Sequence, residues 1–488
     1  MSNRMNRRGF LKASAAAGAG YWLTASALSA SRAADTPNEK IHFACIGVGG
    51  KGGSDTDQVG SLGLIVGLCD VDEDFLNAKA SRFADAKKYF DYRKMFDEVG
   101  KQIDAVTVST PDHTHAPASM RAMKLGKHVY CQKPLTHTPY EARFMRETAR
   151  QMKVCTQMGN QGTAENGLRR AAEFIQAGGL GAVTQAHIWT NRPIWPQAPS
   201  VMARPKTEVA VPKYLHWDEW LGSAEFRPYH HSGDPYKNHR GTYHDFNWRG
   251  WWDFGTGAIG DMGCHTANMA YMALKLGLPH TISAEAGDVN LETCPSFAHV
   301  TMEFAARGDM PAVAWHWYEG RKDKKHVLPS PDLVKGQKKR GDKEFAVFFE
   351  DNVWRFARPG QKGKEVSSGS FLVGEKGVLF SPDDYGADAY IVTEDAVEKL
   401  TGKPEKMPIN GGGDQGMKSE WVKAIRENNP AIAISNFEYS SMLTEAILLG
   451  NVAIRCGEKI TYDGEKGAVN DSKAAEFLKG TYRKGFEL

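Results

Sequence analysis

The feature that most constrains the fold of this chain is a glycine-rich turn near its start. A short apolar run over 41–46 leads into Gly47-Val48-Gly49-Gly50-Lys51-Gly52, which satisfies the pattern G-x-G-x-x-G. A second apolar run, 64–69, ends at Asp70, 23 positions after Gly47. Strand, glycine turn, helix, strand and acid in this order predict a βαβ unit that binds a dinucleotide.

Each residue of this unit has a physical role. Gly47 permits a sharp turn, Gly49 lets backbone N–H groups approach a pyrophosphate, and Gly52 lets the following helix pack closely on the sheet. The Asp70 carboxylate is placed to hold a ribose 2′-hydroxyl and would repel a 2′-phosphate, so the sequence favours NAD over NADP. The alternative interpretation is that these glycines only form turns.

Parallel β-α-β winding continues along the chain. The apolar run 105–109 leads into Thr110-Pro111-Asp112-His113-Thr114-His115, and the run 128–131 leads into Gln132-Lys133-Pro134. Loops after parallel strands open at the same carboxyl edge of the sheet, so both loops are expected to face the cofactor crevice. We therefore predict cofactor contacts from Thr110, Pro111, His115 and Lys133, although Lys133 alone could equally be a solvated loop lysine.

The order of these motifs resembles the Gfo/Idh/MocA family of sugar and inositol dehydrogenases. The family's second signature is matched downstream by Gly257-Ala258-Ile259-Gly260-Asp261-Met262-Gly263-Cys264-His265. The resemblance implies that Lys133, Asp261 and His265 lie near the substrate. Two positions depart from the family pattern: Gln132 replaces the usual glutamate before the lysine, and Asp112 replaces the usual asparagine.

Asp261 and His265 are four positions apart, so on a helix they share one face. The carboxylate could orient the imidazole, whose ordinary pKa of about 6.5 suits a general base near neutral pH. The alternative is an aspartate N-cap and a buried core histidine. Neighbouring Cys264 could suggest a metal or thiol centre, but the chain has no spaced second set of ligands, and we predict no metal site.

The second half of the chain predicts a different architecture. Strand-like runs at 182–190, 281–289, 297–304, 312–317, 345–349 and 371–379 are separated mostly by polar loops, which favours a large antiparallel-rich sheet. We expect an α/β fold: an NAD-binding Rossmann domain over 38–157, with a doubly wound parallel sheet, and an α+β domain with an open, mostly antiparallel sheet over 158–488. Late helices at 415–427 and 439–455 are expected to pack near the first domain, and the family resemblance implies a homo-oligomer.

An aromatic segment precedes the second signature. Seven of the twelve tryptophans lie between Trp189 and Trp252, among several tyrosines, histidines and arginines. Aromatic rings stack on sugar rings while polar groups bond hydroxyls, so the segment suggests a carbohydrate pocket, although at least half of the tryptophans should pack in a core. The substrate-binding residues that we expect are Asn160, Trp248, Arg249 and Trp252.

The N-terminus is typical of an export signal. Asn6-Arg7-Arg8-Gly9-Phe10-Leu11-Lys12 is a twin-arginine pattern, and the Ala- and Gly-rich stretch after it is too weakly apolar for a spanning helix. We predict a signal over 1–34, a periplasmic or cell-envelope location, and no stable membrane span after its removal; an ordinary amphipathic helix is the alternative.

The charge and cysteine content exclude several classes of protein. The five basic residues within 1–34 account for the formal charge of +3, and the remaining chain carries −2, so nucleic acid is an unsuitable partner. The seven cysteines have no paired C-x-x-C spacing, and we expect mostly buried free thiols.

Three functions remain open on the sequence. The leading one is an exported oxidoreductase that transfers a hydride between a sugar or glycoside carbon and tightly bound NAD. A redox-neutral glycosidase, which oxidises, eliminates and re-reduces with the same NAD, would use the same residues. The third is a non-catalytic NAD-binding regulator.

Overall fold

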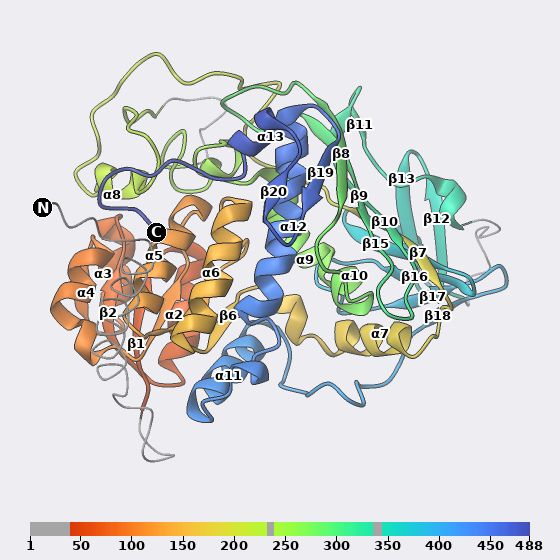
Figure 1. Cartoon of the computed structure of the whole chain (residues 1–488), viewed down its shortest axis with the longest axis horizontal. Coiled ribbons are helices and arrows are strands. Elements are labelled where there is room, and N and C mark those ends of the chain that lie inside the picture. The colour runs from red at the N-terminus through yellow and green to blue at the C-terminus, as the bar shows by residue number, and fades with distance from the viewer. Residues whose placement is uncertain (1–39, 232–238, 335–343) are drawn as a thin grey trace, which may run out of the picture.

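The computed structural model describes residues 40–231, 239–334 and 344–488, and the predicted export signal lies outside these ranges. Figure 1 shows a first domain at the left, a large sheet at the right and the long helix α12 between them. Within the described ranges, no helix combines the length and apolar character needed to span a bilayer.

The first domain contains a six-stranded, wholly parallel sheet with the order β3-β2-β1-β4-β5-β6. Its strands are β1 (His42–Ile46), β2 (Leu64–Cys69), β3 (Lys87–Tyr89), β4 (Ala105–Val108), β5 (His128–Cys131) and β6 (Thr156–Met158). Its helices are α2 (Gly50–Gly60), α3 (Glu73–Ala80), α4 (Tyr92–Val99), α5 (Asp112–Lys124) and α6 (Pro139–Met152). The predicted Rossmann architecture is confirmed.

Both faces of this sheet are covered, because successive residues of each strand point to opposite sides. Phe43 and Cys45 of β1 belong to one apolar cluster with α2 and α3, and Ala44 and Ile46 belong to another with α4, α5 and α6. The C-terminal helix α11 (Gly413–Arg426) completes the first cluster, where its Trp421 ring lies 5.8 Å from Phe43. A late segment therefore fills the core of the first domain, as expected for the late helices.

The second domain is built on an eleven-stranded sheet with the order β18-β17-β16-β15-β7-β10-β9-β8-β19-β20, and β11 pairs with β10. Its neighbours are antiparallel except for β7 and β10. The strands are β7 (Val183–Trp189), β8 (Thr281–Gly287), β9 (Phe297–Phe304), β10 (Val313–Lys322), β11 (Lys325–His326), β15 (Gly369–Gly374), β16 (Gly377–Ser381), β17 (Tyr390–Val392), β18 (Val397–Lys399), β19 (Ile460–Asp463) and β20 (Ala468–Val469). The predicted open sheet is confirmed, but the run expected over 371–379 is a hairpin of two strands turning at Glu375 and Lys376.

Helices cover one face of the large sheet, and a small sheet covers part of the other. The helices of this half are α7 (Asn166–Gln176), α8 (Trp217–Leu221), α9 (Gly257–Thr266), α10 (Asn268–Ala273), α12 (Phe437–Cys456) and α13 (Ser472–Glu476). The small sheet consists of β12 (Ala346–Glu350), β13 (Val353–Ala357) and β14 (Lys364–Glu365). Trp354 of β13 packs edge-on against Phe371 at 4.7 Å.

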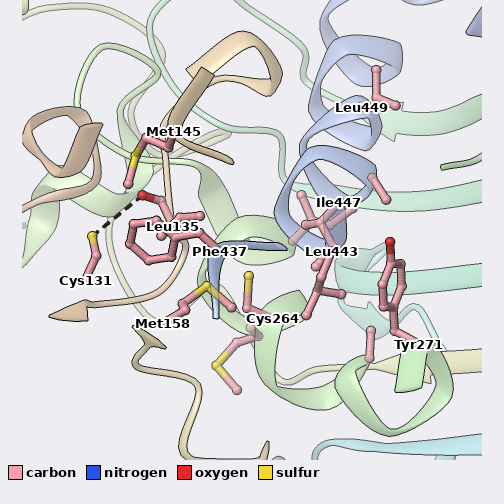
Figure 2. Packing of buried hydrophobic residues seen from close by; sticks show 14 of the residues in the cluster. Cys131, Leu135, Met145, Met158, Cys264, Tyr271, Phe437, Leu443, Ile447 and Leu449 are labelled. Atoms are coloured by element: carbon pink, nitrogen blue, oxygen red, sulfur yellow. Dashed lines mark hydrogen bonds between the residues drawn. The ribbon is translucent and has the colours of Figure 1, made fainter. Parts of the chain in front are cut away.

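One apolar core joins the two domains. Figure 2 shows Leu443 and Ile447 of α12 among side chains from both halves, including Met145 of α6, Met158 of β6 and Cys264 of α9. All seven cysteines are buried free thiols, as predicted. Because α9 packs on α12 within this shared core, the second signature is held rigidly against the first domain.

Candidate active site

The glycine turn lies where β1 ends and α2 begins. Gly47 has a φ of +77°, and a Cβ there would lie 2.5 Å from the Ser109 carbonyl oxygen. A Cβ on Gly52 would collide with the Gly47 carbonyl oxygen, so neither position admits a side chain. The N-cap Gly49 makes no side-chain cap, which leaves the first N–H groups of α2 available to an anion. The turn therefore fits the pyrophosphate of a dinucleotide.

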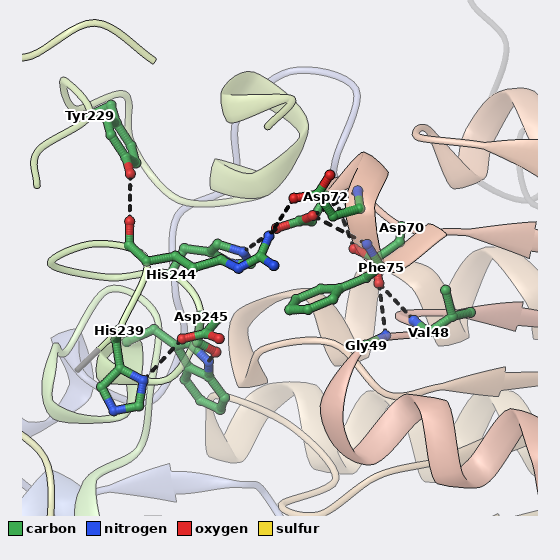
Figure 3. Close-up of polar contacts among 12 residues, drawn as sticks. Val48, Gly49, Asp70, Asp72, Phe75, Tyr229, His239, His244 and Asp245 are labelled. Carbon is green, nitrogen blue, oxygen red and sulfur yellow. Dashed lines mark hydrogen bonds and ion pairs between the residues drawn. The ribbon is translucent and has the colours of Figure 1, made fainter. Parts of the chain in front are cut away.

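Asp70 is fixed beside this turn at the end of β2 (Figure 3). Its Oδ2 accepts hydrogen bonds from Val48 N at 2.7 Å and Gly49 N at 3.1 Å, and its Oδ1 accepts from Asp72 N at 3.0 Å. Burial raises the pKa of Asp70, while the amides of Asp72 and Val48 oppose that rise. The carboxyl group is thus immobilised where a ribose hydroxyl would meet it, as the choice of NAD requires.

A cleft of about 410 Å³ runs along the carboxyl edge of the first sheet. The cofactor residues predicted from the sequence that line it are Gly47, Gly49, Asp70, Thr110, Pro111 and Lys133. The other two predicted cofactor residues, Gly52 and His115, do not line the cleft. His115 Nδ1 lies 2.7 Å from the Pro134 carbonyl oxygen, and His115 Nε2 lies 2.7 Å from the Thr110 carbonyl oxygen. His115 therefore joins the two loops that line the cleft.

Lys133 reaches across the cleft to the second domain. Its Nζ donates to Asp261 Oδ1 at 2.8 Å and to the Asp261 carbonyl oxygen at 2.9 Å. Burial would raise the pKa of Asp261, but Lys133 and Arg249 hold it well below its ordinary range. Asp261 therefore remains ionised, and the two residues form a charged pair that joins β5 to α9.

His265 lies behind this pair and does not line the cleft. Its side chain is buried, its Nδ1 has no hydrogen-bond partner among the described residues, and its ring meets Tyr385 edge-on at 5.1 Å. Burial and the nearby Lys133 lower the pKa of His265 well below 6.5, so the imidazole is neutral. The helix places Asp261 and His265 near each other, but Lys133 takes the carboxylate that we expected to orient the imidazole.

The structure also explains Gln132. Its Nε2 donates to Asp55 Oδ2 at 2.8 Å, and Asp55 is a fully buried carboxylate on α2. Lys418 of α11 and Lys51 approach the other oxygen, Oδ1, at 2.7 Å and 2.8 Å. Burial raises the pKa of Asp55, but the two lysines outweigh this effect and lower it. Asp55 already supplies the buried negative charge, so an amide and not a second carboxylate is suited to position 132.

Asp112, the other departure from the family pattern, faces the cleft. Its Oδ2 accepts from Thr256 N at 3.1 Å and from Thr256 Oγ1 at 2.7 Å, which ties α5 to the start of α9. Burial raises the pKa of Asp112 to about 7. The carboxyl group therefore titrates near neutral pH inside the site, a property that the sequence signalled only by replacing an amide with an acid.

The aromatic segment divides between a core and the cleft. Four tryptophans, Trp217, Trp220, Trp248 and Trp251, pack with Tyr229, Tyr243 and Phe254 in a separate apolar cluster, and Trp220 and Trp248 also line the cleft. Phe246, Trp248 and Arg249 line the cleft, and the Arg249 guanidinium lies 4.4 Å and 4.2 Å from the two ring centroids. The segment thus supplies one aromatic and cationic wall of the site.

Two of the expected substrate residues lie elsewhere. Asn160 is fully buried, donates to the Cys264 carbonyl oxygen at 3.3 Å and accepts from Ser435. Trp252 packs on Arg455 at 5.1 Å, behind α9. Neither residue lines the cleft. Asn160 supports α9, the helix that carries Asp261, whereas Trp252 packs against Arg455 of α12.

A set of contacts that covers the far end of the cleft, formed by Asp72 with Arg240 and His244 and called the roof below, was not predicted from the sequence. Asp72, two residues after Asp70, is fully buried and accepts from Arg240 Nη1 at 2.7 Å, with His244 Nε2 at 2.9 Å (Figure 3). The second-domain backbone also attaches there, because His216 N donates to the Val71 carbonyl oxygen at 2.9 Å. Phe486 of the C-terminal tail lines the same end.

Comparisons with known proteins agree with this architecture. Residues 41–160 match the model of the oxidoreductase family with an NAD-binding Rossmann fold, and residues 199–311 match that of the same family's C-terminal α/β domain. The chain belongs to the Gfo/Idh/MocA oxidoreductase family.

Individual relatives are similar over limited stretches. Inositol 2-dehydrogenase 3 of Saccharopolyspora erythraea is 32% identical over 138 residues, which cover 27% of this chain and 41% of the relative. A glycosyl hydrolase family 109 protein of the same organism is 29% identical over 194 residues, 34% of this chain and 42% of the relative. The chain thus spans less than half the length of these curated relatives.

A solved structure gives the fold over a longer stretch. An inositol dehydrogenase homologue from Azotobacter vinelandii, complexed with NADH and myo-inositol, superposes with a TM-score of 0.56 at 14% identity, covering 87% of this chain and 98% of that one.

Across residues 40–231, 239–334 and 344–488 of the present chain, no group of three or more His, Cys, Asp or Glu side chains is arranged to hold a metal.

Proposed function

We propose that this protein is an NAD-dependent oxidoreductase that transfers a hydride between NAD and the carbon of a sugar or glycoside hydroxyl. The observation that carries the proposal is the charged pair of Lys133 and Asp261, which shares one cleft with the glycine turn and Asp70. A relative named inositol 2-dehydrogenase and a structural neighbour complexed with NADH and myo-inositol support the same chemistry.

The position of each residue in the site indicates its role in the reaction. When bound, NAD supplies the hydride acceptor, and the α2 N-terminus and Asp70 hold its pyrophosphate and ribose. Lys133, which lines the cleft, donates a hydrogen bond to the reacting hydroxyl oxygen and stabilises its negative charge as the proton leaves. His265 lies behind Lys133 and does not line the cleft, so the proton reaches its neutral imidazole only if substrate binding exposes the ring, and its lowered pKa makes it a weak base. Asp261 fixes the direction of the lysine.

The roof of the cleft supports a resident cofactor. Arg240 bridges Asp72 and Asp74, and its guanidinium lies 4.4 Å from the centre of the Phe75 ring. These residues follow Asp70, which would hold the adenosine ribose. A dinucleotide placed under these contacts would leave only when the second-domain segment lifts from β2. The reduced cofactor would then be reoxidised in place, either by a second carbonyl substrate or, in a redox-neutral reaction, by return of the hydride to the same sugar.

Redox-neutral glycoside cleavage is the second candidate, and a resident cofactor favours it. Bound NAD would supply a temporary hydride acceptor: oxidation of the C3 hydroxyl to a ketone would acidify the C2–H, and loss of that proton would break the C1–O bond and expel the aglycone as its conjugate acid. Addition of water and reduction at C3 would then restore the sugar. The relative named glycosyl hydrolase family 109 protein supports this candidate. The same Lys133 and His265 would serve both reactions.

The test begins with protein as isolated. We expect about one dinucleotide to be released per chain on acid denaturation, and about one equivalent or more of a glycoside to be converted per chain without added NAD. Free sugar and aglycone would establish the glycosidase, whereas a keto-sugar with stoichiometric NADH would establish the dehydrogenase. Lys133→Met should keep the dinucleotide and lose activity by about 10²-fold or more. Exposed Lys101→Met is the matched control, and unchanged activity in Lys133→Met would refute the proposal.

Export and assembly are part of the proposal. We propose that the twin-arginine segment carries the folded holoprotein out of the cytoplasm and that the mature protein is a homo-oligomer. Replacing Arg7 and Arg8 by lysine should retain the protein in the cytoplasm on fractionation. Light scattering of the purified protein measures its mass, and a monomer would contradict the second statement.

A further inference from the structure

Asp261 has three basic side chains around it, of which Lys133 and Arg249 line the cleft and Arg192 does not. Lys133 Nζ lies 2.8 Å and Arg249 Nε 3.4 Å from Asp261 Oδ1, and Arg192 Nε lies 3.9 Å from Asp261 Oδ2. Lys133 also donates to the Asp261 carbonyl oxygen, so of the three basic residues it is the one bound most closely to Asp261. The two arginines lie farther from Asp261, and Arg192 Nη1 donates instead to Asn191 Oδ1.

Arg249 is held in place without needing a salt bridge. The rings of Phe246 and Trp248 lie close to its guanidinium, and its Nη1 donates to the Phe246 carbonyl oxygen at 3.1 Å. Its Nη2 has no hydrogen-bond partner in the part of the chain that the structure describes, and its side chain is 23% exposed. A fixed, planar guanidinium with a free donor edge matches the geometry of a carboxylate.

Nearby acids do not remove the excess of positive charge. Asp112 accepts both of its hydrogen bonds from Thr256, and its raised pKa of about 7 leaves it half protonated at neutral pH. Asp384 lies near Arg192, and burial raises its pKa as well. Among the described residues, Lys133, Arg192 and Arg249 thus share Asp261 as their paired carboxylate, while Asp245, which also lines the cleft, is paired with His239. An uncompensated charge in such a partly desolvated site is costly.

We propose that this site selects an anionic sugar, namely a uronic acid or uronide whose carboxylate binds Arg249, with Arg192 on the far side of Asp261. The inference rests on the proposed function, since it names the substrate class of that site. Lys133 and Arg249 approach the same Asp261 oxygen, so one pyranose ring can present its reacting hydroxyl to the lysine and its carboxylate to the arginine.

The test compares substrates that differ only in the carboxylate. The holoprotein is assayed with p-nitrophenyl glucuronide, the matching glucoside and a 6-sulfated glucoside, and binding of glucuronate and glucose is measured by calorimetry. We expect the glucuronide to have the highest kcat/KM and glucuronate to bind more tightly than glucose. Arg249→Met should lower the glucuronide-to-glucoside ratio about 10-fold to 100-fold, chiefly through KM, the loss typical of one charge-assisted hydrogen bond.

Arg249→Lys should recover part of that ratio, and Arg358→Met, at an exposed arginine of the second domain, should leave it unchanged. General damage to the site would lower both activities and preserve their ratio. Equal or better use of the glucoside, or preference for the sulfated sugar, would overturn the inference while leaving the oxidoreductase proposal intact. Tight glucuronate binding that depends on Arg249, without turnover of any sugar, would uphold the inference and refute the proposed activity.

Discussion

The amide of Gln132 offers the sharpest test of how the site is built. Replacing it by glutamate changes one atom and restores the residue usual in the family, yet it would put a second carboxylate at the position that now donates to Asp55 Oδ2 at 2.8 Å. Asp55 is fully buried, so the two negative charges could not be separated by water. We therefore expect Gln132→Glu to be strongly destabilising despite its conservative size.

The magnitude follows from two competing costs. Two unit charges about 3 Å apart repel by about 5–6 kcal/mol at an effective dielectric constant of about 20. Keeping a glutamate of ordinary pKa about 4.3 protonated at pH 7 costs about 3.7 kcal/mol, so the new group takes up a proton instead. Lys51 and Lys418 offset part of this cost. We expect a loss of about 2–4 kcal/mol at pH 7 and of about 1 kcal/mol or less at pH 5.

Urea unfolding of the cofactor-saturated protein at pH 5, 6, 7 and 8 measures this loss. In the Gln132→Glu variant, the pKa of the introduced carboxyl group is raised in the folded state above its unfolded value. The penalty must therefore grow as the pH rises from about 4.3 towards that raised pKa. Gln132→Met removes the hydrogen bond without adding charge and should cost about 1–3 kcal/mol at every pH. Asp55→Asn combined with Gln132→Glu should recover most of the stability. A penalty independent of pH would refute the reasoning.

Three further predictions concern the cleft. Asp112→Asn should raise the free energy of unfolding, because ionising the buried carboxyl group of the parent protein costs free energy. The difference between the two proteins should grow by up to about 1.4 kcal/mol per pH unit from about pH 4 to pH 7 and stay constant at higher pH. A difference that does not change with pH in urea titrations would contradict this. Arg240→Met should accelerate NAD dissociation about 10-fold or more in stopped-flow measurements, whereas exposed Arg82→Met should not. The kcat of the parent protein should not decrease as the pH is lowered past about 6.5, because burial and Lys133 lower the pKa of His265. A decrease in kcat at that pH, absent in His265→Asn, would show instead that the imidazole is exposed.

Local patterns predicted the parts of the molecule that depend on local geometry. The glycine turn and Asp70 are linked by one βαβ unit, so spacing alone placed them together. Lys133 could be placed at the cleft because loops after parallel strands share one edge of the sheet. Asp261 and His265 lie on one helix as their spacing indicated.

The partners of these residues could not be predicted, because they come from distant segments. Asp55 and Lys418 are 363 positions apart, and no periodicity indicates that a C-terminal helix closes the network behind Gln132. Lys133 competes with His265 for the same carboxylate, and only the three-dimensional distances decide between them. The roof over the cofactor depends likewise on Arg240 meeting Asp72, a contact between two domains.

In the function that we propose, a sugar carbon gives its hydride to a dinucleotide held in this cleft. The most direct measurement mixes as-isolated protein with a uniformly deuterated sugar or glycoside, quenches the reaction in alkali within one turnover, and weighs the released dinucleotide by mass spectrometry. We expect NADH carrying one deuterium, formed by the parent protein and not by Lys133→Met. Recovery of unlabelled dinucleotide while the sugar is consumed, or of no dinucleotide at all, would contradict it.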